Sequence, residues 1–229
     1  MMEQALQAEC ARLGIALTQE QIALFRAFSD ALIEKNKVMN LTAITEPEGV
    51  AKLHFADCLA LLNVVDCRNK SVIDVGCGAG FPGVPMKLGE PSIRLTLLDS
   101  LQKRVSWLRE TLEILGVEAA CVAARAEEYA ARENFDIAVS RAVARLNVLA
   151  ELCLPFVRVG GYFLAMKGAA AKEELQEAKH ALHVLGGSVA RVAEYDLDGV
   201  TRRVIIVRKD RPTPAAYPRR FAKIKQQPL

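Results

Sequence analysis

The sequence has no pair of cysteines at the C-x-x-C spacing that redox motifs and many zinc sites use. Its six cysteines are scattered, and several stand inside apolar runs. This pattern argues against a disulfide framework and a structural zinc site, and it indicates reduced, buried thiols. His180 and His183 share one predicted helix face without an evident third ligand. We therefore expect an exposed helix face there and no bound metal.

Long hydrophobic runs are also missing. Although 52% of the residues are hydrophobic, no apolar run approaches the roughly 20 residues of a membrane-spanning helix. The N-terminal sequence MMEQALQAEC carries glutamates where a signal peptide needs a basic and then an apolar stretch. We expect a cytoplasmic protein with one large core, neither exported nor bound to a membrane.

Acidic residues are scarce near the C-terminus. Between Arg202 and Lys225 there are nine Lys and Arg residues and one acid, Asp210, which gives this segment a net charge of +8. The whole chain carries +3, so the remainder carries −5. An acidic body with a basic end suggests a polyanionic partner at that end, and a solvated charged tail is the alternative.

The first 65 residues have a helical pattern. Thr18 to Gln21 forms a capping-box sequence that precedes a helix with an apolar stripe from Ile22 to Ile33. After a short break at residues 40–45, Pro47 begins a second helix that we expect to reach about Val65. We predict an N-terminal helical extension over residues 1–66.

From Ser71 onward, short apolar runs alternate with helical patterns, which predicts a parallel sheet covered on both faces. Near the end, Asp198-Gly199 separates two strand-like runs, and a D-G turn in that setting predicts a hairpin. The predicted strands are SVIDV (71–75), IRLTLLD (93–99), AACVAA (119–124), FDIAVS (135–140), GYFLAMK (161–167), SVARVAEYDL (188–197) and RRVIIVRK (202–209).

Strands in this order are typical of one α/β architecture. Parallel strands that end in an antiparallel hairpin, with helices ahead of the first strand, indicate the class I S-adenosylmethionine-dependent methyltransferase fold. This fold is Rossmann-like and has a seven-stranded, mostly parallel sheet. We assign it to residues 67–210 and predict a separate basic tail over residues 211–229.

A glycine-rich loop, DVGCGAG, follows the first predicted strand. In an open parallel sheet, ligands bind beyond the carboxyl ends of the strands, and glycines allow the backbone to approach them. A dinucleotide site would place its third glycine where Phe81 stands, and the carboxylate of Asp74 would repel a pyrophosphate. The same carboxylate suits the cationic groups of S-adenosylmethionine. The loop therefore favours S-adenosylmethionine over NAD, with Asp74, Gly76 and Gly78 as candidate contacts.

Acidic residues also follow the second and third predicted strands. Asp99 lies about 20 residues beyond the loop, where a carboxylate accepts hydrogen bonds from ribose hydroxyls. The alternative is a helix N-cap for the following helix, and both roles are compatible. Ala126-Glu127 stands where an adenine edge would lie, and an ordinary first-turn glutamate is the alternative.

The fourth predicted strand leads into Ser140-Arg141-Ala142 and lacks a Pro-Pro-aromatic motif at that place. Methyltransferases that act on exocyclic amines usually carry such a motif there. The sequence therefore argues against adenine N6 or cytosine N4 as the methylated atom.

Seven stretches together resemble the RsmG (GidB) family, which methylates small-subunit ribosomal RNA in bacteria. They span most of the chain in the family's order, and only their combination is specific. The stretches are NLTAIT (40–45), HFADCLAL (54–61), IDVGCGAGFPGVP (73–85), LLDSLQKRVSWL (97–108), ARAEEY (124–129), FDIAVSRAVARL (135–146) and AMKG (165–168).

The resemblance implies methyl transfer from S-adenosylmethionine to N7 of a guanine in the decoding region of 16S rRNA. It places cofactor contacts on Gly76, Phe81, Ala126-Glu127 and Arg141. Because guanine N7 has a free lone pair, we expect no acid or base residue. Arg141 is our candidate for orienting the cofactor or substrate. Lys167 is a second candidate for substrate contact, with a snorkelling surface lysine as the alternative.

The partner implied by the resemblance is 16S rRNA or the small ribosomal subunit, bound by a monomeric enzyme. We expect the basic segment 202–225, together with Lys52 and His54, to flank the RNA groove. A methyltransferase of another RNA is the first alternative. An NAD-dependent oxidoreductase and an RNA-binding protein without catalysis fit the loop less well.

Overall fold

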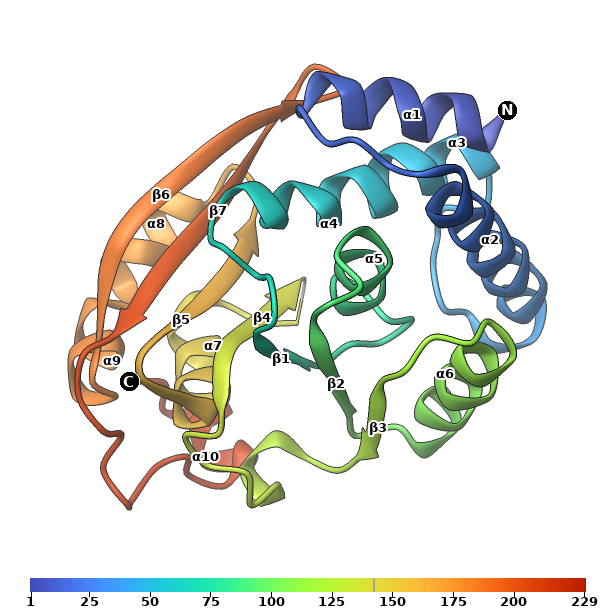
Figure 1. Cartoon of the computed structure of the whole chain (residues 1–229). Coiled ribbons are helices and arrows are strands. Elements are labelled where there is room, and N and C mark those ends of the chain that lie inside the picture. The colour runs from blue at the N-terminus through green and yellow to red at the C-terminus, as the bar shows by residue number, and fades with distance from the viewer. Residues whose placement is uncertain (142) are drawn as a thin grey trace.

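The apolar runs form seven strands in one sheet, whose order is β3-β2-β1-β4-β5-β7-β6. The computed structural model describes residues 1–141 and 143–229. Strands β1 to β5 are parallel, and β7 runs antiparallel to both β5 and β6. The predicted α/β architecture with a closing hairpin is confirmed (Figure 1). The strands are β1 (Ser71–Val75), β2 (Arg94–Asp99), β3 (Ala120–Ala123), β4 (Phe135–Arg141), β5 (Val157–Lys167), β6 (Gly187–Leu197) and β7 (Val200–Lys209).

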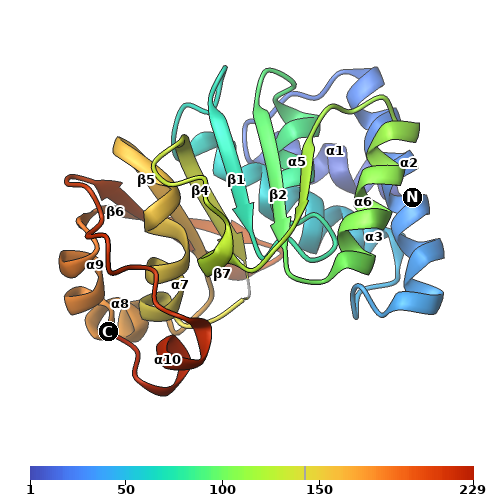
Figure 2. The same cartoon turned by 90° about the horizontal axis from the view of Figure 1, so that it is seen from below.

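One group of helices covers one face of the sheet, as Figures 1 and 2 show. Alternation along β1 sends Val72 into this core and Ile73 into the core on the opposite face. The helices of the first face are α1 (Met2–Arg12), α2 (Gln19–Met39), α3 (Pro47–Gly49), α4 (Asp57–Leu59), α5 (Gly83–Gly89) and α6 (Gln102–Ile114).

A second group of helices packs on the opposite face. Its last member comes from the basic C-terminal segment, and Ile224 of that helix is fully buried. The C-terminal segment is therefore attached to the sheet domain through an apolar contact. These helices are α7 (Leu146–Cys153), α8 (Ala171–Glu177), α9 (Lys179–Val184) and α10 (Phe221–Gln226).

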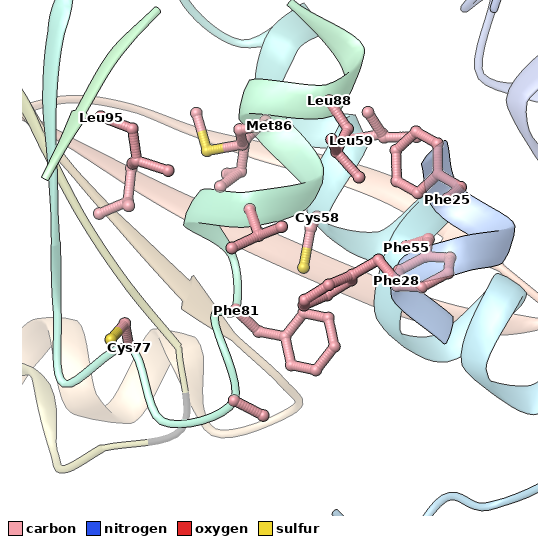
Figure 3. Close-up of a cluster of buried hydrophobic side chains, with 14 of the residues drawn as sticks. Phe25, Phe28, Phe55, Cys58, Leu59, Cys77, Phe81, Met86, Leu88 and Leu95 are labelled. Carbon is pink, nitrogen blue, oxygen red and sulfur yellow. The ribbon is translucent and has the colours of Figure 1, made fainter. Parts of the chain in front are cut away.

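The N-terminal helices share one apolar core with the sheet. Phe28 of α2 and Phe55 pack against Phe81, which directly follows the glycine loop, and Phe25 of α2 packs on Phe55 behind them (Figure 3). The ring centroids of Phe28 and Phe81 are 6.2 Å apart, and so are those of Phe55 and Phe81. The N-terminal helices therefore brace the loop. The domain boundaries at residues 66 and 210 stay a prediction.

Two local predictions are confirmed at atomic detail. The Thr18 N–H donates to Gln21 Oε1 at 2.8 Å, and the Gln21 N–H donates to Thr18 Oγ1 at 3.2 Å, which is a capping box. In the hairpin turn, Asp198 and Gly199 have φ values of +54° and +76°. A type I′ turn requires positive φ at both of its central residues.

The helix that begins at Pro47 differs from the prediction in one respect. Residues Val50–Ala56 form a π-helical segment between α3 and α4, and the helical stretch ends in a 3₁₀ turn at Ala60–Asn63. Apolar spacing does not distinguish i→i+5 from i→i+4 hydrogen bonding, so this segment could not be anticipated. Such π segments occur often at functional sites.

Candidate functional site

The glycine loop closes over the ends of β1 and β2. The N–H groups of Gly76 and Cys77 donate to the Leu98 carbonyl oxygen at 2.8 and 3.1 Å. Gly76, Gly78 and Gly80 have φ values of +74°, +55° and +94°. L-residues avoid this region because their Cβ meets the backbone, so glycine at all three positions allows the sharp turn.

Missing side chains also shape the space around the loop. A Cβ at Gly76 would lie 2.7 Å from Val143 Cγ2. A Cβ at Gly78 would meet none of the described heavy atoms within 4 Å and would point into open space. The first glycine permits close packing, and the second leaves bare backbone on the open side.

Asp99, at the end of β2, holds the loop in place. Its Oδ2 accepts from the Gly78 N–H at 2.9 Å, and its Oδ1 accepts from the Leu101 N–H at 2.9 Å. Leu101, rather than Asp99, is the N-cap residue of α6. The alternative of an N-cap role is therefore wrong in detail, although the Asp99 carboxylate does bind the backbone before this helix.

Asp74 lies beneath the loop. Its side chain is fully buried, and Oδ2 accepts from the N–H of Gly83, the first residue of α5, at 2.7 Å. Burial raises the pKa of Asp74 to about 7. Its Oδ1 has no hydrogen-bond partner among the described residues. This carboxylate joins the end of β1 to α5 and is absent from the residues that line the cavities beside the loop, so its contact with the cofactor stays a prediction.

A cavity of about 380 Å³, the loop cavity, lies on the open side of the glycine loop. A smaller cavity of about 140 Å³, the Glu127 cavity, shares Gly76, Asp99, Ser100 and Val143 with it. The two cavities form one trough along the carboxyl ends of β1, β2 and β3. The loop cavity is lined by residues that include Leu41, Thr42, His54, Gly76, Gly78, Phe81, Asp99, Arg104 and Arg141.

A third cavity of about 620 Å³, the Lys167 cavity, shares His54, Arg141 and Val143 with the loop cavity. Its walls come from the π-helical segment, β4, β5, β6 and β7. Several charged and polar side chains line it, including Asp57, Arg145, Lys167, Glu174, Tyr195, Arg202 and Arg203.

Arg141, at the end of β4, stands where the loop cavity and the Lys167 cavity meet. Its guanidinium carbon lies 4.8 Å from the centroid of the Phe81 ring, and the His54 ring stacks on Phe81 at 4.5 Å. Nη1 donates to the Leu53 carbonyl oxygen at 3.2 Å and lies 3.4 Å from Asp57 Oδ2. Arg141 is thus held by an aromatic face, a backbone carbonyl and a carboxylate, with 16% of its side chain exposed.

The contacts of His54 define its protonation. Arg141 Nη2 donates to His54 Nδ1 at 3.0 Å, so the ring hydrogen is on Nε2 and is donated to Thr42 Oγ1 at 2.7 Å. Burial and the neighbouring Arg141 charge lower the pKa of His54 from its ordinary 6.5 to about 4. His54 is therefore neutral at physiological pH, with both ring nitrogens engaged.

Asp57 connects this cluster to the C-terminal hairpin. Its Oδ1 accepts from the Tyr195 hydroxyl at 2.8 Å and lies 3.7 Å from Arg202 Nε. Burial, followed by the charge of Asp57, raises the pKa of Tyr195, so the hydroxyl keeps its proton. The carboxylate of Asp57 thus joins the N-terminal helices to β4, β6 and β7.

Lys167, at the end of β5, is almost buried, with 8% of its side chain exposed. Its Nζ donates to the Ala144 carbonyl oxygen at 2.7 Å and pairs with Glu174 Oε2 at 2.8 Å. The alternative of a snorkelling surface lysine is therefore wrong. Lys167 fixes the segment after β4 against α8 while lining the Lys167 cavity, and its contact with substrate stays a prediction.

Ala126 and Glu127 lie in a single 3₁₀ turn, Ala126–Glu128, after β3. Both line the Glu127 cavity together with Leu98, Leu152 and Phe221. Glu127 Oε1 accepts from the Phe221 N–H at 3.3 Å, so this glutamate is more than an ordinary first-turn residue. The contact places the start of α10 beside the turn.

The cations of residues 202–225 do not share one surface. Arg202 and Arg203 line the Lys167 cavity, whereas Lys209 is fully buried and donates to the Leu154 carbonyl oxygen at 2.6 Å. Arg219 is paired with buried Glu151 at 2.6 Å. The expectation that this segment forms a single RNA-facing basic end needs correction, because several of its charges stabilise the fold.

Ser140 of the predicted Ser140-Arg141-Ala142 stretch is buried and donates to the Val75 carbonyl oxygen at 2.9 Å, while Ala142 lies outside the described residues. All six cysteines are free, and five of them are buried. Within residues 1–141 and 143–229, no group of three or more His, Cys, Asp and Glu side chains could hold a metal ion. No helix in this part of the chain is long and apolar enough to cross a bilayer.

Comparison with known proteins identifies the family. The GidB family, described as rRNA small subunit methyltransferase G, matches residues 21–204. The chain belongs to the GidB family. The predicted enzyme class, an S-adenosylmethionine-dependent rRNA methyltransferase, is thereby confirmed, and an NAD-dependent oxidoreductase is not supported.

Relatives of the chain in the GidB family cover nearly its whole length. A protein of Halalkalibacterium halodurans named "Ribosomal RNA small subunit methyltransferase G" is 46% identical over 224 residues, which are 94% of this chain and 94% of that protein. A protein of the same name from Acetivibrio thermocellus is 45% identical over 223 residues, which are 94% of this chain and 92% of that protein.

Solved structures support the fold assignment. A SAM-dependent methyltransferase from Aquifex aeolicus superposes with a TM-score of 0.55 at 17% identity, over 76% of this chain and 97% of that one. M. jannaschii TYW2 in complex with AdoMet gives a TM-score of 0.55 at 11% identity, over 66% of this chain and 73% of that one. At these identities the likeness shows the fold alone.

Several residues of the site had no assigned role in the sequence interpretation. Thr42 and Asp57 lie in stretches that carry the GidB resemblance, so their presence there was a usable signal. Tyr195 lies in a strand of alternating polarity, where a single aromatic residue is common and does not indicate a functional role. Val143 also lies in a stretch that carries the GidB resemblance, whereas Phe221 reaches the Glu127 cavity through long-range packing alone.

Proposed function

We propose that the protein transfers the methyl group of S-adenosylmethionine to N7 of a specific guanine in the decoding region of 16S rRNA. The observation that carries this proposal is the position of Arg141, which borders both the loop cavity and the Lys167 cavity. A cofactor in the first cavity and a base in the second would meet beside Arg141. The substrate is rRNA, free or within the small subunit.

The trough suits S-adenosylmethionine in shape and chemistry. Bare backbone at Gly78 leaves room for close approach, and Asp99 lies at the junction of the two parts, where a carboxylate would accept from ribose hydroxyls. The turn at Ala126-Glu127 would take the adenine end, and Asp74 would hold the loop in shape through its bond to the Gly83 N–H. When bound, the cofactor supplies an electrophilic methyl group on a cationic sulfur.

The proposed chemistry needs positioning rather than acid–base catalysis. The lone pair of guanine N7 forms the new N–C bond, and the electrons of the broken C–S bond stay on sulfur. The products are S-adenosylhomocysteine and a cationic 7-methylguanine, and no proton is moved. Neutral His54, with both nitrogens engaged, and Tyr195, with its hydroxyl donating to Asp57, fit a site without a general base.

Arg141 is the residue that we assign to orientation. Its contacts with Phe81, His54 and Asp57 fix the guanidinium before any substrate binds. A donor on N7 would block the nucleophile, so Arg141 would contact the cofactor, guanine O6 or a flanking phosphate. Lys167 would support this geometry by holding the Ala144 carbonyl oxygen.

The surroundings of the Lys167 cavity support a nucleic-acid substrate. Arg202 and Arg203 lie at its wall, and Lys52 pairs with Asp198 at 3.6 Å near the hairpin turn. Side chains of this kind bind phosphates and make affinity depend on salt. A guanine stacked in RNA would also have to be turned out of its stack to enter the cavity.

The remaining assignments are also part of this proposal. Residues 1–66 form a helical extension, residues 67–210 the methyltransferase domain and residues 211–229 a C-terminal tail. The enzyme acts as a monomer in the cytoplasm. Size-exclusion chromatography with light scattering tests the monomer, and a dimer at working concentration would contradict it.

The deciding experiment supplies a labelled methyl donor and small ribosomal subunits that lack the modification. Cleavage of the product RNA at 7-methylguanine then identifies the methylated position. We expect label at N7 of one guanine in the decoding region. Label on another base, or none on 16S rRNA, would contradict the proposal. Repeating the assay with naked 16S rRNA shows which form is the substrate.

A further inference from the structure

The C-terminal helix α10 begins at the Glu127 cavity. Figure 1 shows it next to the segment that follows β3, and Phe221 lines the cavity together with Leu98, Ala126 and Leu152. The Phe221 N–H donates to Glu127 Oε1 at 3.3 Å. A segment nearly 100 positions away in the sequence thus completes the wall of a cavity that otherwise belongs to the glycine-loop side of the site.

Buried polar contacts fix this position. Arg219 binds Glu151 of α7 through three bonds: its backbone N–H and Nε donate to Oε1 at 2.8 Å each, and Nη2 donates to Oε2 at 2.6 Å. Glu151 is fully buried. Breaking such a pair leaves an uncompensated buried charge, so the pair holds the segment firmly. Ile224, which follows Phe221 in α10, is also fully buried and anchors the helix on the C-terminal side of Phe221.

Further contacts attach the chain between β7 and α10. Lys209 Nζ donates to Thr213 Oγ1 at 2.7 Å, and the Thr213 hydroxyl donates to the Leu185 carbonyl oxygen at 2.8 Å. Arg132 donates to the carbonyl oxygens of Tyr217 and Thr213. These contacts hold the tail in one position, so Phe221 is a fixed part of the cavity wall. The charge of Arg219 is compensated by Glu151.

We propose that Phe221 is a cofactor-binding residue, whose ring forms one wall of the adenine site in the Glu127 cavity. This inference rests on the proposed function, which puts the adenine beside Ala126-Glu127. Purine rings bind well between aromatic and aliphatic side chains, and Phe221, Leu98 and Leu152 supply these. The basic tail then serves cofactor binding, although its charge had suggested RNA.

Calorimetry with S-adenosylhomocysteine and with adenosine tests this role. We expect Phe221→Ala to weaken both ligands by the same factor, about 10-fold, because the lost contact is to the adenine ring that both share. Phe221→Leu keeps an apolar wall and should lose less. Lys223→Ala, an exposed change in the same helix, is the matched control and should bind like the wild type.

Each outcome separates the inference from the proposed function. If the wild type binds neither ligand, the cofactor trough itself is wrong. If the wild type binds and Phe221→Ala binds equally well, Phe221 forms no part of the adenine site. Tighter binding by Phe221→Ala would show that the ring obstructs the cavity, which also overturns the inference.

Hydrogen exchange of the wild-type protein gives an independent test that needs no substitution. S-adenosylhomocysteine should slow amide exchange at residues 219–224 as well as in the glycine loop, because the ligand would contact both. Protection of the loop with unchanged exchange in the C-terminal helix would overturn the assignment of Phe221, whatever the stability of the variants.

Discussion

The glycine-loop side and the Lys167 side of the site are built in different ways. The loop side uses residues 74–81 and the end of the neighbouring strand, which hydrogen-bond across short distances in the sequence. The Lys167 side depends on contacts such as Tyr195 with Asp57, which are 138 positions apart. The comparison teaches that the turn of the glycine loop is encoded locally, although Phe28, Phe55 and Phe221 complete the cofactor side from distant parts of the chain. The Lys167 side exists only once the N-terminal helices and the hairpin have packed together.

Arg141 is where the two sides meet. It comes from β4 in the middle of the sheet and binds Leu53, His54 and Asp57 of the N-terminal helices. Phe81, which follows the glycine loop, lies against the same guanidinium. Variants of residues on one side should therefore affect one ligand, and variants of Arg141 should affect the reaction as a whole.

Replacing Arg141 should have the largest effect. We expect Arg141→Ala to lower the single-turnover rate of methyl transfer by about 100-fold or more, since small misplacements of reacting groups have effects of this size. Loss of its hydrogen bonds should lower the free energy of unfolding by only about 1–3 kcal/mol. Single-turnover kinetics and urea unfolding measure the two quantities.

Arg158→Ala is the matched control for Arg141→Ala. Arg158 pairs with Asp136 at 2.6 Å at the start of β5, at the opposite end of the strands from the site. The Arg158→Ala substitution removes a paired arginine but changes neither cavity wall near Arg141. The single-turnover rate of this variant should therefore match that of the wild type. Wild-type turnover by Arg141→Ala would remove Arg141 from the reaction.

A change on the loop side should affect the cofactor alone. Gly78→Ala puts a methyl group into the loop cavity at φ +55°, and we expect S-adenosylhomocysteine to bind about 10-fold more weakly. Gly116→Ala, at φ +67° and also facing open space, carries the same backbone penalty of about 1–2 kcal/mol away from the site. Equal loss of affinity in both variants would mean that backbone strain, rather than the cavity, explains the effect.

A change on the Lys167 side should affect the RNA step alone. Tyr195→Phe removes the hydroxyl that donates to Asp57, and we expect the rate with RNA substrate to fall about 5-fold through lost order in the Arg141 cluster. The affinity for S-adenosylhomocysteine should stay unchanged in calorimetry. Tyr162→Phe, elsewhere in the sheet, is the control. A weaker cofactor affinity in Tyr195→Phe would break the division between the two sides.

The smallest expected effect on turnover is that of His54, whose contribution is to the dependence of stability on pH. Because the pKa of His54 is lowered from 6.5 to about 4, the unfolded chain binds a proton between these values and the folded protein does not. His54 should therefore lower the free energy of unfolding as the pH drops through this range, by up to about 1.4 kcal/mol per pH unit. Asp74, whose pKa is raised to about 7, contributes in the opposite direction, so the His54 effect is read as the difference between the wild type and a His54 variant.

Urea unfolding at several pH values between about 4 and 6.5 measures the slope of the free energy of unfolding against pH. His54→Gln should remove the contribution of His54, and His180→Gln, an exposed change in α9, is the control. An unchanged slope in His54→Gln would mean that His54 is not held neutral by burial and the Arg141 charge.

Much of the fold could be predicted from the sequence because its signals are local. Apolar runs and the Asp198-Gly199 turn gave the strands to within a few residues, and the Thr18 capping box gave the start of α2. The D-x-G-x-G-x-G loop was found because glycine at positive φ is nearly obligatory there. These features need only neighbouring residues.

The rest depended on packing that periodicity does not encode. The π-helical segment that presents His54 has the same apolar spacing as an ordinary helix. The buried positions of Lys167 and Lys209 contradict the usual exposure of lysine. Lys167 donates to Ala144, 23 positions away, and Lys209 donates to Leu154, 55 positions away. The basic tail was predicted to bind RNA because the buried acidic partner of Arg219, Glu151, lies far away in the sequence.

The central claim is that Arg141 and its neighbours catalyse methyl transfer by positioning, without a general base. The single-turnover rate at saturating cofactor and small subunits, measured between about pH 6 and pH 8, tests it most directly. We predict the same shape of profile for the wild type and His54→Gln, because guanine N7 loses no proton and His54 is neutral throughout this range. Any change of rate within this range should follow Asp74, whose pKa is raised to about 7 by burial. A rate that rises about tenfold per pH unit, and loses this dependence in His54→Gln, would contradict the account.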